Sequence, residues 1–216
     1  MYEKNETVRI ESFSDGVFAI AITLLVIEIK VPSHSEVATI GLFKALLNLW
    51  PSYLAFLTSF ATILVFWVHH HWIFVMVNKY DHSLFYLNGL LLLFVTFIPF
   101  PTTLLSDYLM YNGSKIAAIF YSGMFVAISL SFDALWRHVS TRLISENAIS
   151  EKKEEAIEIT KHYRFGPPLY LGAFVVSFVS EPLSIAMCLL LALFFALRGW
   201  PFKEVLYNPQ QSRRIP

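Results

Sequence analysis

The sequence predicts an all-α membrane protein with six transmembrane helices. Two features of the composition point this way: hydrophobic residues fill 56% of the 216 positions, and charged residues fill only 15%. A third feature is that long apolar runs recur along the chain, and they can cross a hydrocarbon core of about 30 Å. A segment in lipid must pair its own backbone groups, so each of these runs is expected to be a helix.

The first span is predicted at residues 7–30, where polar residues interrupt an otherwise apolar run. Asp15 lies near the start of the span. At about 100° per residue, one face of the helix carries four residues: Ile20, Thr23, Leu24 and Ile27. Ordinary helix packing explains such a stripe. An acid within the same span, beside a stripe that contains a hydroxyl, also indicates a permeation path.

The other five spans follow the remaining apolar runs. They are predicted at 46–77, 84–105, 116–136, 165–179 and 183–198. Residues 137–164 are rich in charge, and we expect them to continue the fourth helix and then form an amphipathic hairpin at the cytoplasmic membrane surface. Residues 199–216 are expected to be a polar cytoplasmic tail.

Prolines set several of the expected boundaries. Pro32 should end the first span and open a polar loop over residues 31–37. Pro51 interrupts the second span near its start, and Pro99 and Pro101 should kink or end the third span near its outer side.

The distribution of basic residues predicts the orientation. With six spans and the N-terminus inside, thirteen of the 16 Lys and Arg residues fall on the inner side. The outer side keeps only Lys30, Lys44 and Lys115. Both termini are therefore expected in the cytoplasm. The net charge is zero, so no basic excess favours nucleic acid as a partner.

Several polar residues are predicted to meet at the inner side of the bundle. Arg9 and Asp15 are about 240° apart on one helix and cannot pair with each other, so each needs a partner on another helix. The candidates at a compatible depth are Trp67, His69, His70 and His71 on the second span and Asn88 on the third. A buried network of these groups with Ser14 would satisfy costly polar atoms. Alternatively, Arg9 extends to the membrane surface and the histidines lie at the interface.

No metal, haem or catalytic cofactor is expected. His69, His70 and His71 point about 100° apart on a helix, so they cannot converge on one ion. The lone Cys188 excludes an internal disulfide and a thiolate metal site. No T-V-G-Y-G filter, Walker loop, nucleophile elbow or H-E-x-x-H motif is present, so neither a carbonyl filter nor an enzyme is predicted.

The first span also carries a recognisable motif. Arg9, Phe13, Ser14 and Asp15 form R-x-x-x-F-S-D, followed by GVFAIAITLLVIEI. This stretch resembles the transmembrane protein 175 family, which contains potassium channels of animal lysosomes and shorter prokaryotic relatives. Trp67 to His71 resembles the family's W-x-x-H-H pattern on the second span. F-S-D occurs once, so the chain resembles a single-repeat prokaryotic form, which implies a multi-pass protein of a prokaryotic plasma membrane.

The resemblance implies a homotetramer in which four first helices line the pore. Ile20 would form the narrowest apolar ring, with Leu24 and Ile27 as further rings, and Thr23 would supply the hydroxyl that favours potassium. The R-x-x-x-F-S-D residues would tie the first helix to the second and third through Trp67 and one of the three histidines. Which histidine takes part stays open.

The expected function is a passive cation channel with a modest preference for potassium over sodium. The alternative is a proton-coupled transporter that uses Asp15 and a histidine of the second span as a relay. A third class, a membrane enzyme or haem electron carrier, would need an axial partner such as His82 or His138.

Overall fold

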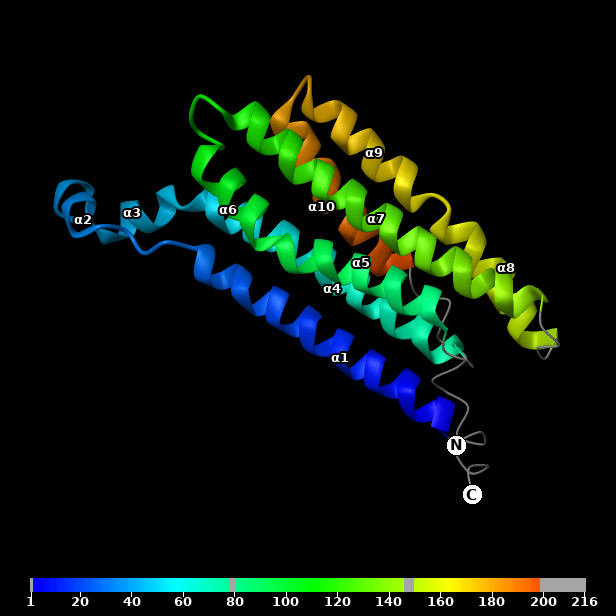
Figure 1. Cartoon of the computed structure of the whole chain (residues 1–216). Coiled ribbons are helices and arrows are strands. Elements are labelled where there is room, and N and C mark those ends of the chain that lie inside the picture. The colour runs from blue at the N-terminus through cyan, green and yellow to red at the C-terminus, as the bar shows by residue number, and fades with distance from the viewer. Residues whose placement is uncertain (1, 78–80, 146–149, 199–216) are drawn as a thin grey trace.

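The protein is an elongated bundle of helices, seen in a computed structural model that describes residues 2–77, 81–145 and 150–198. The described residues contain helices and turns but no strand. In Figure 1 the long helices run side by side, with α1 at one edge and α8 and α9 at the opposite edge. The chain is thus an all-helical membrane protein.

The helices follow the predicted order. α1 (Tyr2–Leu24) continues as the short 3-10 helix η1 (Leu25–Glu28). The other long helices are α4 (Trp50–Met76), α5 (His82–Phe97) with α6 (Pro99–Tyr108), and α7 (Ser114–Ser145). The C-terminal part contains α8 (Ser150–Tyr163), α9 (Gly166–Ser177) and α10 (Glu181–Arg198).

Four helical segments in the described residues are long and apolar enough to cross a membrane. They are Thr7–Glu28, Trp50–Met76, His82–Tyr108 and Ser114–Leu143. The apolar part of α10, Glu181–Leu197, is shorter, and α9 has 12 residues. The first four predicted spans therefore coincide with long helices, while the last two coincide with shorter ones.

The start of the second span differs from the expected position, and its physical reason lies in Pro51. We expected a span from residue 46, but the helix breaks at Leu49 and α4 begins at Trp50. Pro51 occupies the first turn of α4, where its missing N–H needs no partner. Pro99 plays the same role at the start of α6, so α5 and α6 form one bent span that reaches Tyr108 rather than residue 105.

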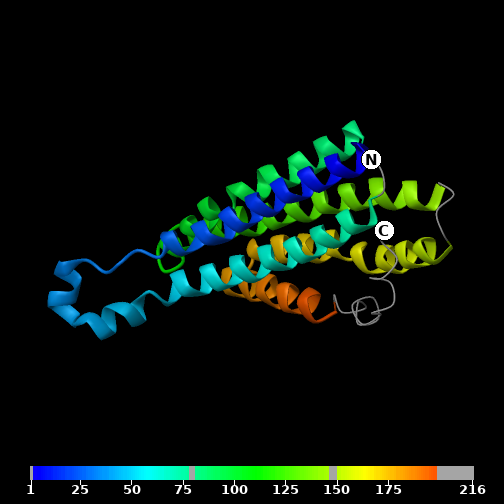
Figure 2. The same cartoon turned by 90° about the horizontal axis from the view of Figure 1, so that it is seen from below.

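The segment between α1 and α4 is partly helical, which corrects the prediction of a loop over residues 31–37. It contains α2 (His34–Ile40) and α3 (Leu42–Asn48), joined at Gly41 with φ of 81°. Ser33 accepts a hydrogen bond from the backbone N–H of Glu36, which caps α2. The S-x-x-E spacing was readable as this cap. α2 and α3 extend beyond the end of the bundle as an arm (Figure 2).

α7 is the central scaffold of the bundle. It packs against α5, α6, α8, α9 and α10. Large buried aromatic residues, including Tyr121, Phe125, Trp136 and Tyr170, fill the space around it. Buried hydroxyls add specific ties: Ser59 on α4 bonds both Thr102 of α6 and Tyr121 of α7. Such hydrogen bonds hold membrane helices together where apolar contacts alone are weakly specific.

α7 runs past the predicted end of the fourth span and continues to Ser145, and α8 returns along it. The Trp136 Nε1–H donates to Thr160 Oγ1 at 3.0 Å and joins the two helices. The hairpin predicted at 137–164 thus consists of the end of α7 and α8, although residues 146–149 at its tip lie outside the described residues. The tail predicted at 199–216 also lies outside them.

One acid links α5 to α7 just outside the membrane-spanning part. Asp81 caps α5 by accepting from the Leu84 N–H at 2.9 Å, and it also contacts His138 and Arg142 of α7. Partial burial alone would raise the pKa of this carboxyl. The Leu84 N–H, His138 and Arg142 outweigh burial, so the pKa of Asp81 is lowered.

Asp81→Ala should lower stability by about 1 kcal/mol, the usual cost of a lost N-cap. A lowered carboxylate pKa stabilises the fold above the unfolded value of about 3.9, and this contribution disappears as pH falls through the lower folded pKa. Thermal unfolding in detergent should therefore separate wild type from variant at neutral pH but not in strong acid. An unchanged gap in strong acid would contradict the assignment.

Candidate functional site

The first helix has one buried face and one open face. Ser14, Phe18, Ala21 and Leu25 lie at successive turns, are at most 2% exposed, and pack toward α4 and α5. The opposite face is apolar and open: Ile20 is 60% exposed and Ile27 70%. Among the described residues no element covers this stripe, so it is left for lipid or for another protein surface.

The four residues predicted to line a pathway all lie on the open side of α1. Leu24 is 41% exposed, and Thr23 is exposed between Ile20 and Ile27. The Thr23 hydroxyl donates to the Ile20 carbonyl at 2.9 Å. Because this bond uses the hydroxyl hydrogen, the oxygen lone pairs stay available as acceptors on the open face.

Two polar contacts, one turn apart, fasten α1 to α4. Trp67 Nε1–H donates to Asp15 Oδ1 at 2.8 Å. His71 Nδ1 lies 2.9 Å from Glu11 Oε1. Each helix supplies residues four apart, so the two contacts share one face of each helix. Glu11 was not predicted, although its four-residue spacing from Asp15, matching that of Trp67 and His71, is visible in the sequence.

A second set of bonds connects α4, α5 and α1 in sequence. His70 Nε2 lies 2.8 Å from Asn88 Oδ1, and Asn88 Nδ2–H donates to Ser14 Oγ at 2.9 Å. The Ser14 hydroxyl in turn donates to the Ile10 carbonyl at 2.8 Å. His70 and Ser14 are fully buried and Asn88 is 3% exposed, so these bonds are shielded from water.

The three consecutive histidines serve three different partners. His70 contacts Asn88 and His71 contacts Glu11, whereas His69 Nδ1 lies 2.9 Å from the Tyr163 hydroxyl of α8. Burial raises the pKa of Tyr163, which keeps that hydroxyl neutral. Tyr163 was not predicted. Within the described ranges no group of three metal-ligating side chains comes together.

Arg9 and Phe13 lie apart from these bonds. Both are exposed, and no hydrogen bond or ion pair joins Arg9 to another described residue. They line a groove of about 380 Å³ between α1 and α5, together with Ile10, Phe85, Asn88, Gly89 and Leu92. The single predicted network is therefore two separate sets of contacts, with Arg9 outside both.

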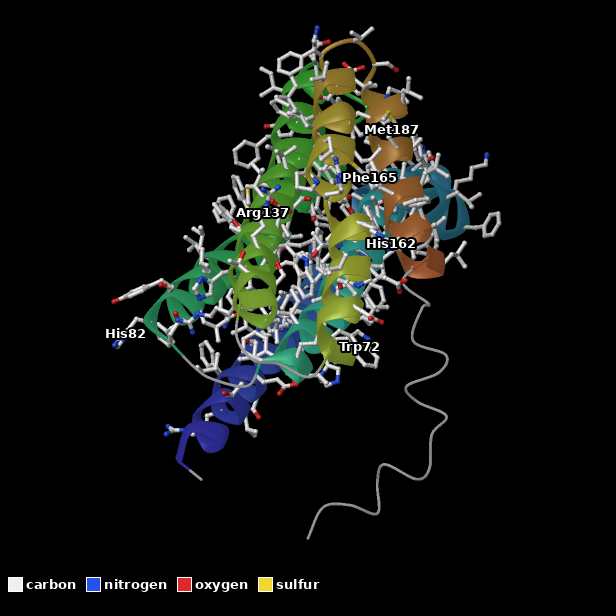
Figure 3. All side chains as sticks on the ribbon, turned by 90° about the vertical axis from the view of Figure 1, so that its right-hand side faces the viewer. Trp72, His82, Arg137, His162, Phe165 and Met187 are labelled. Carbon is white, nitrogen blue, oxygen red and sulfur yellow. The ribbon has the colours of Figure 1, made fainter. Side chains whose placement is uncertain are left out.

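The other end of α1 is fastened to α6. The Thr103 hydroxyl donates to Glu28, and Lys30 forms an ion pair with Asp107. Figure 3 looks from the side where α1 begins, and it shows Trp72 of α4, His82 of α5 and His162 of α8 on that side. α1 is thus held at both ends and along one face, and its opposite face stays exposed along the stripe from Ile20 to Ile27.

This anchored edge helix belongs to an all-helical membrane bundle, and the comparisons with known proteins show that the family is one of ion channels. Residues 9–99 match the model of the family described as endosomal/lysosomal potassium channel TMEM175. The chain belongs to the TMEM175 family of ion channels.

Two relatives match nearly the whole chain, and a third matches about three quarters of it. A potassium channel of Chamaesiphon minutus is 59% identical over 91% of this chain and 97% of its own length. A potassium channel of Streptomyces collinus is 42% identical over 91% of this chain and 95% of its own length. The chicken protein, from Gallus gallus, is named an endosomal/lysosomal proton channel; it is 34% identical over 78% of this chain but only 36% of its own length.

The fold agrees with a solved structure of the same family. The crystal structure of a lysosomal potassium-selective channel TMEM175 homologue from Chamaesiphon minutus superposes with a TM-score of 0.84 at 57% identity. The match covers 91% of this chain and 99% of that one.

Asn88→Ala should destabilise the protein by about 1–3 kcal/mol, because it leaves the His70 N–H without its acceptor in a buried site. The matched control is Asn112→Ala, which changes an exposed amide in the turn before α7. Thermal unfolding in detergent should show a lower midpoint for the first variant alone. Equal midpoints would mean that the buried bonds contribute no net stability.

Proposed function

We propose that the chain forms a homotetrameric potassium channel in which four copies of α1 surround the pathway. The observation that carries this proposal is the open apolar stripe of α1, on a helix whose other face is fixed by buried polar contacts. A ring of copies would cover this stripe without disturbing those contacts. The naming of two bacterial relatives as potassium channels supports the choice of ion.

The same proposal assigns the membrane arrangement. Each protomer would cross a prokaryotic plasma membrane six times, with α9 and α10 as the last two spans. Both termini would lie in the cytoplasm, because thirteen of the 16 basic residues then fall on the inner side.

Ile20, Leu24 and Ile27 would form successive apolar rings along the pathway. A narrow ring of this kind excludes water and closes the pathway by dewetting. In a wider ring an ion must shed part of its hydration shell. Potassium holds its shell less tightly than sodium does, so the ring favours potassium modestly.

The Thr23 oxygen would replace part of the lost hydration. Its hydrogen is engaged with the Ile20 carbonyl, so its lone pairs are directed to the open face and can accept a cation. The permeant ion is potassium, and this scheme requires no cofactor.

A proton-coupled transporter built on Asp15 and a histidine of α4 has weaker support. Asp15 contacts the Trp67 indole, which holds no readily transferred proton, and His70 and His71 have other partners. Flux separates the two classes. A channel passes potassium down its gradient without a pH gradient, whereas the transporter stops when the pH gradient is removed.

Ile20→Asn should raise potassium flux from reconstituted liposomes several-fold, because a polar ring at the constriction stays wetted. Leu190→Asn is the matched control: Leu190 is 63% exposed, similar to Ile20 at 60%, but lies on α10. Flux should rise in the first variant and stay at the wild-type level in the second. An unchanged Ile20→Asn flux would remove Ile20 from the pathway.

Thr23→Ala should lower the preference for potassium over sodium, since it removes the hydroxyl oxygen from the open face. Thr23→Ser keeps that oxygen and should keep the preference. Reversal potentials under bi-ionic conditions measure the ratio directly. The hydroxyl has no role in selectivity if both variants match wild type.

A further inference from the structure

One buried atom lacks a partner within the hydrogen bonds that join α1 to α4 and α5 through Ser14, Asn88 and His70. His70 Nδ1 is the single buried side-chain nitrogen or oxygen without a hydrogen bond among the described residues. Unpaired buried polar atoms are rare and call for an explanation. We propose that His70 Nδ1 is a proton-binding site, and that a proton there releases α1 from α4 and α5. The consequence for conduction rests on the proposed function, because α1 lines a pathway only if the proposed tetramer forms.

The surrounding hydrogen bonds determine where the imidazole proton lies. Ser14 donates to the Ile10 carbonyl, so Ser14 Oγ accepts from the Asn88 amide. The Asn88 oxygen then faces His70 Nε2, which must carry the hydrogen. A flipped Asn88 would place the imidazole hydrogen on Nδ1, where nothing accepts it. The neutral form with a bare Nδ1 lone pair is therefore the form that fits.

The pocket around Nδ1 is apolar on both sides. The Phe74 ring stacks on the imidazole with centroids 4.6 Å apart, and the Phe18 ring lies at 5.3 Å. His70 is fully buried. A second proton would thus create a charged N–H with no acceptor and no water, which is costly. Because Phe18 belongs to α1, separating α1 from α4 opens this pocket.

The charged groups near His70 come from two helices. α1 contributes Asp15, which attracts a proton, and α4 contributes His71, which opposes it when charged. The contact from α5 is the neutral Asn88 amide. Asp15 already accepts a hydrogen bond from Trp67, so it cannot move to neutralise His70 without breaking that bond between α1 and α4. Charge on His70 therefore acts against the packed arrangement.

The sign of the pH effect follows from linkage. In a released state the imidazole would be hydrated and would bind a proton near pH 6.5. The packed state disfavours that proton, so each pH unit below about 6.5 shifts the balance up to tenfold toward release. A proton on His71 acts oppositely, because it adds attraction to Glu11. The two histidines can therefore be distinguished by substitution.

Hydrogen exchange of the full-length protein in detergent tests this directly. After correction for intrinsic exchange, amide protection over residues 13–25 should fall about fivefold between about pH 6.5 and about pH 5.5. His70→Gln keeps an N–H for Asn88 but cannot take up a proton, so its protection should not change. His71→Gln should keep the fall or enlarge it. Unchanged wild-type protection, or an unaltered fall in His70→Gln, would overturn the proposal.

A second variant covers the case in which His70→Gln fails to fold. Asn88→Asp places a carboxylate beside Nε2 and stabilises the charged imidazole in the packed state, so the fall in protection at low pH should shrink or disappear. A fall as large as in wild type would count against the site. Potassium flux from liposomes at the same pH values separates the two proposals. If hydrogen exchange depends on pH but no potassium flux is seen, the channel proposal is rejected and the proton site stands. If potassium flux is seen but hydrogen exchange does not depend on pH, the proton site is rejected and the channel proposal stands.

Discussion

The rotation of the first helix about its own axis is the constraint on which the rest depends. Apolar side chains pack acceptably in several rotational settings, but hydrogen bonds do not. The Trp67–Asp15 bond and the Asn88–Ser14 bond approach α1 from two different helices. Turning α1 would break both in a setting where water cannot replace them. These bonds therefore determine which residues of α1 are presented outward, and Ile20 is among them.

This constraint explains why polar residues occur within an otherwise apolar span. Each buried hydroxyl, amide or carboxylate costs free energy unless it is paired, so a helix that served only as an anchor would carry none. Here the polar groups occupy the face toward α4 and α5, and the stripe from Ile20 to Ile27 is left free of them apart from Thr23. The bonds of Glu28 and Lys30 to α6 hold the other end, so the stripe is presented by a rigid element.

Much of this arrangement was predictable from helix geometry. The 100° rule placed Ile20, Thr23, Leu24 and Ile27 together, and equal depth along antiparallel spans paired Asp15 with Trp67 and brought Asn88 near the histidines. The rest depends on tertiary contacts that spacing does not encode. Three consecutive histidines face three directions, so the choice of His70 required the positions of the neighbouring helices. Tyr163 reaches His69 only because α8 folds back along α7, and Arg9 stays apart because its side of α1 faces a groove.

The histidine triplet has a structural consequence of its own. Residues 69, 70 and 71 lie at one level of α4. His69 connects α4 to α8, and His70 connects it through Asn88 to α5 and α1. His71 connects α4 to α1 directly. α4 is the element that these contacts share, so a rotation of α4 at this level would strain all three at once. The hairpin formed by the end of α7 and α8 and the buried face of α1 therefore contact the same turn of α4, through two adjacent residues, His69 and His70.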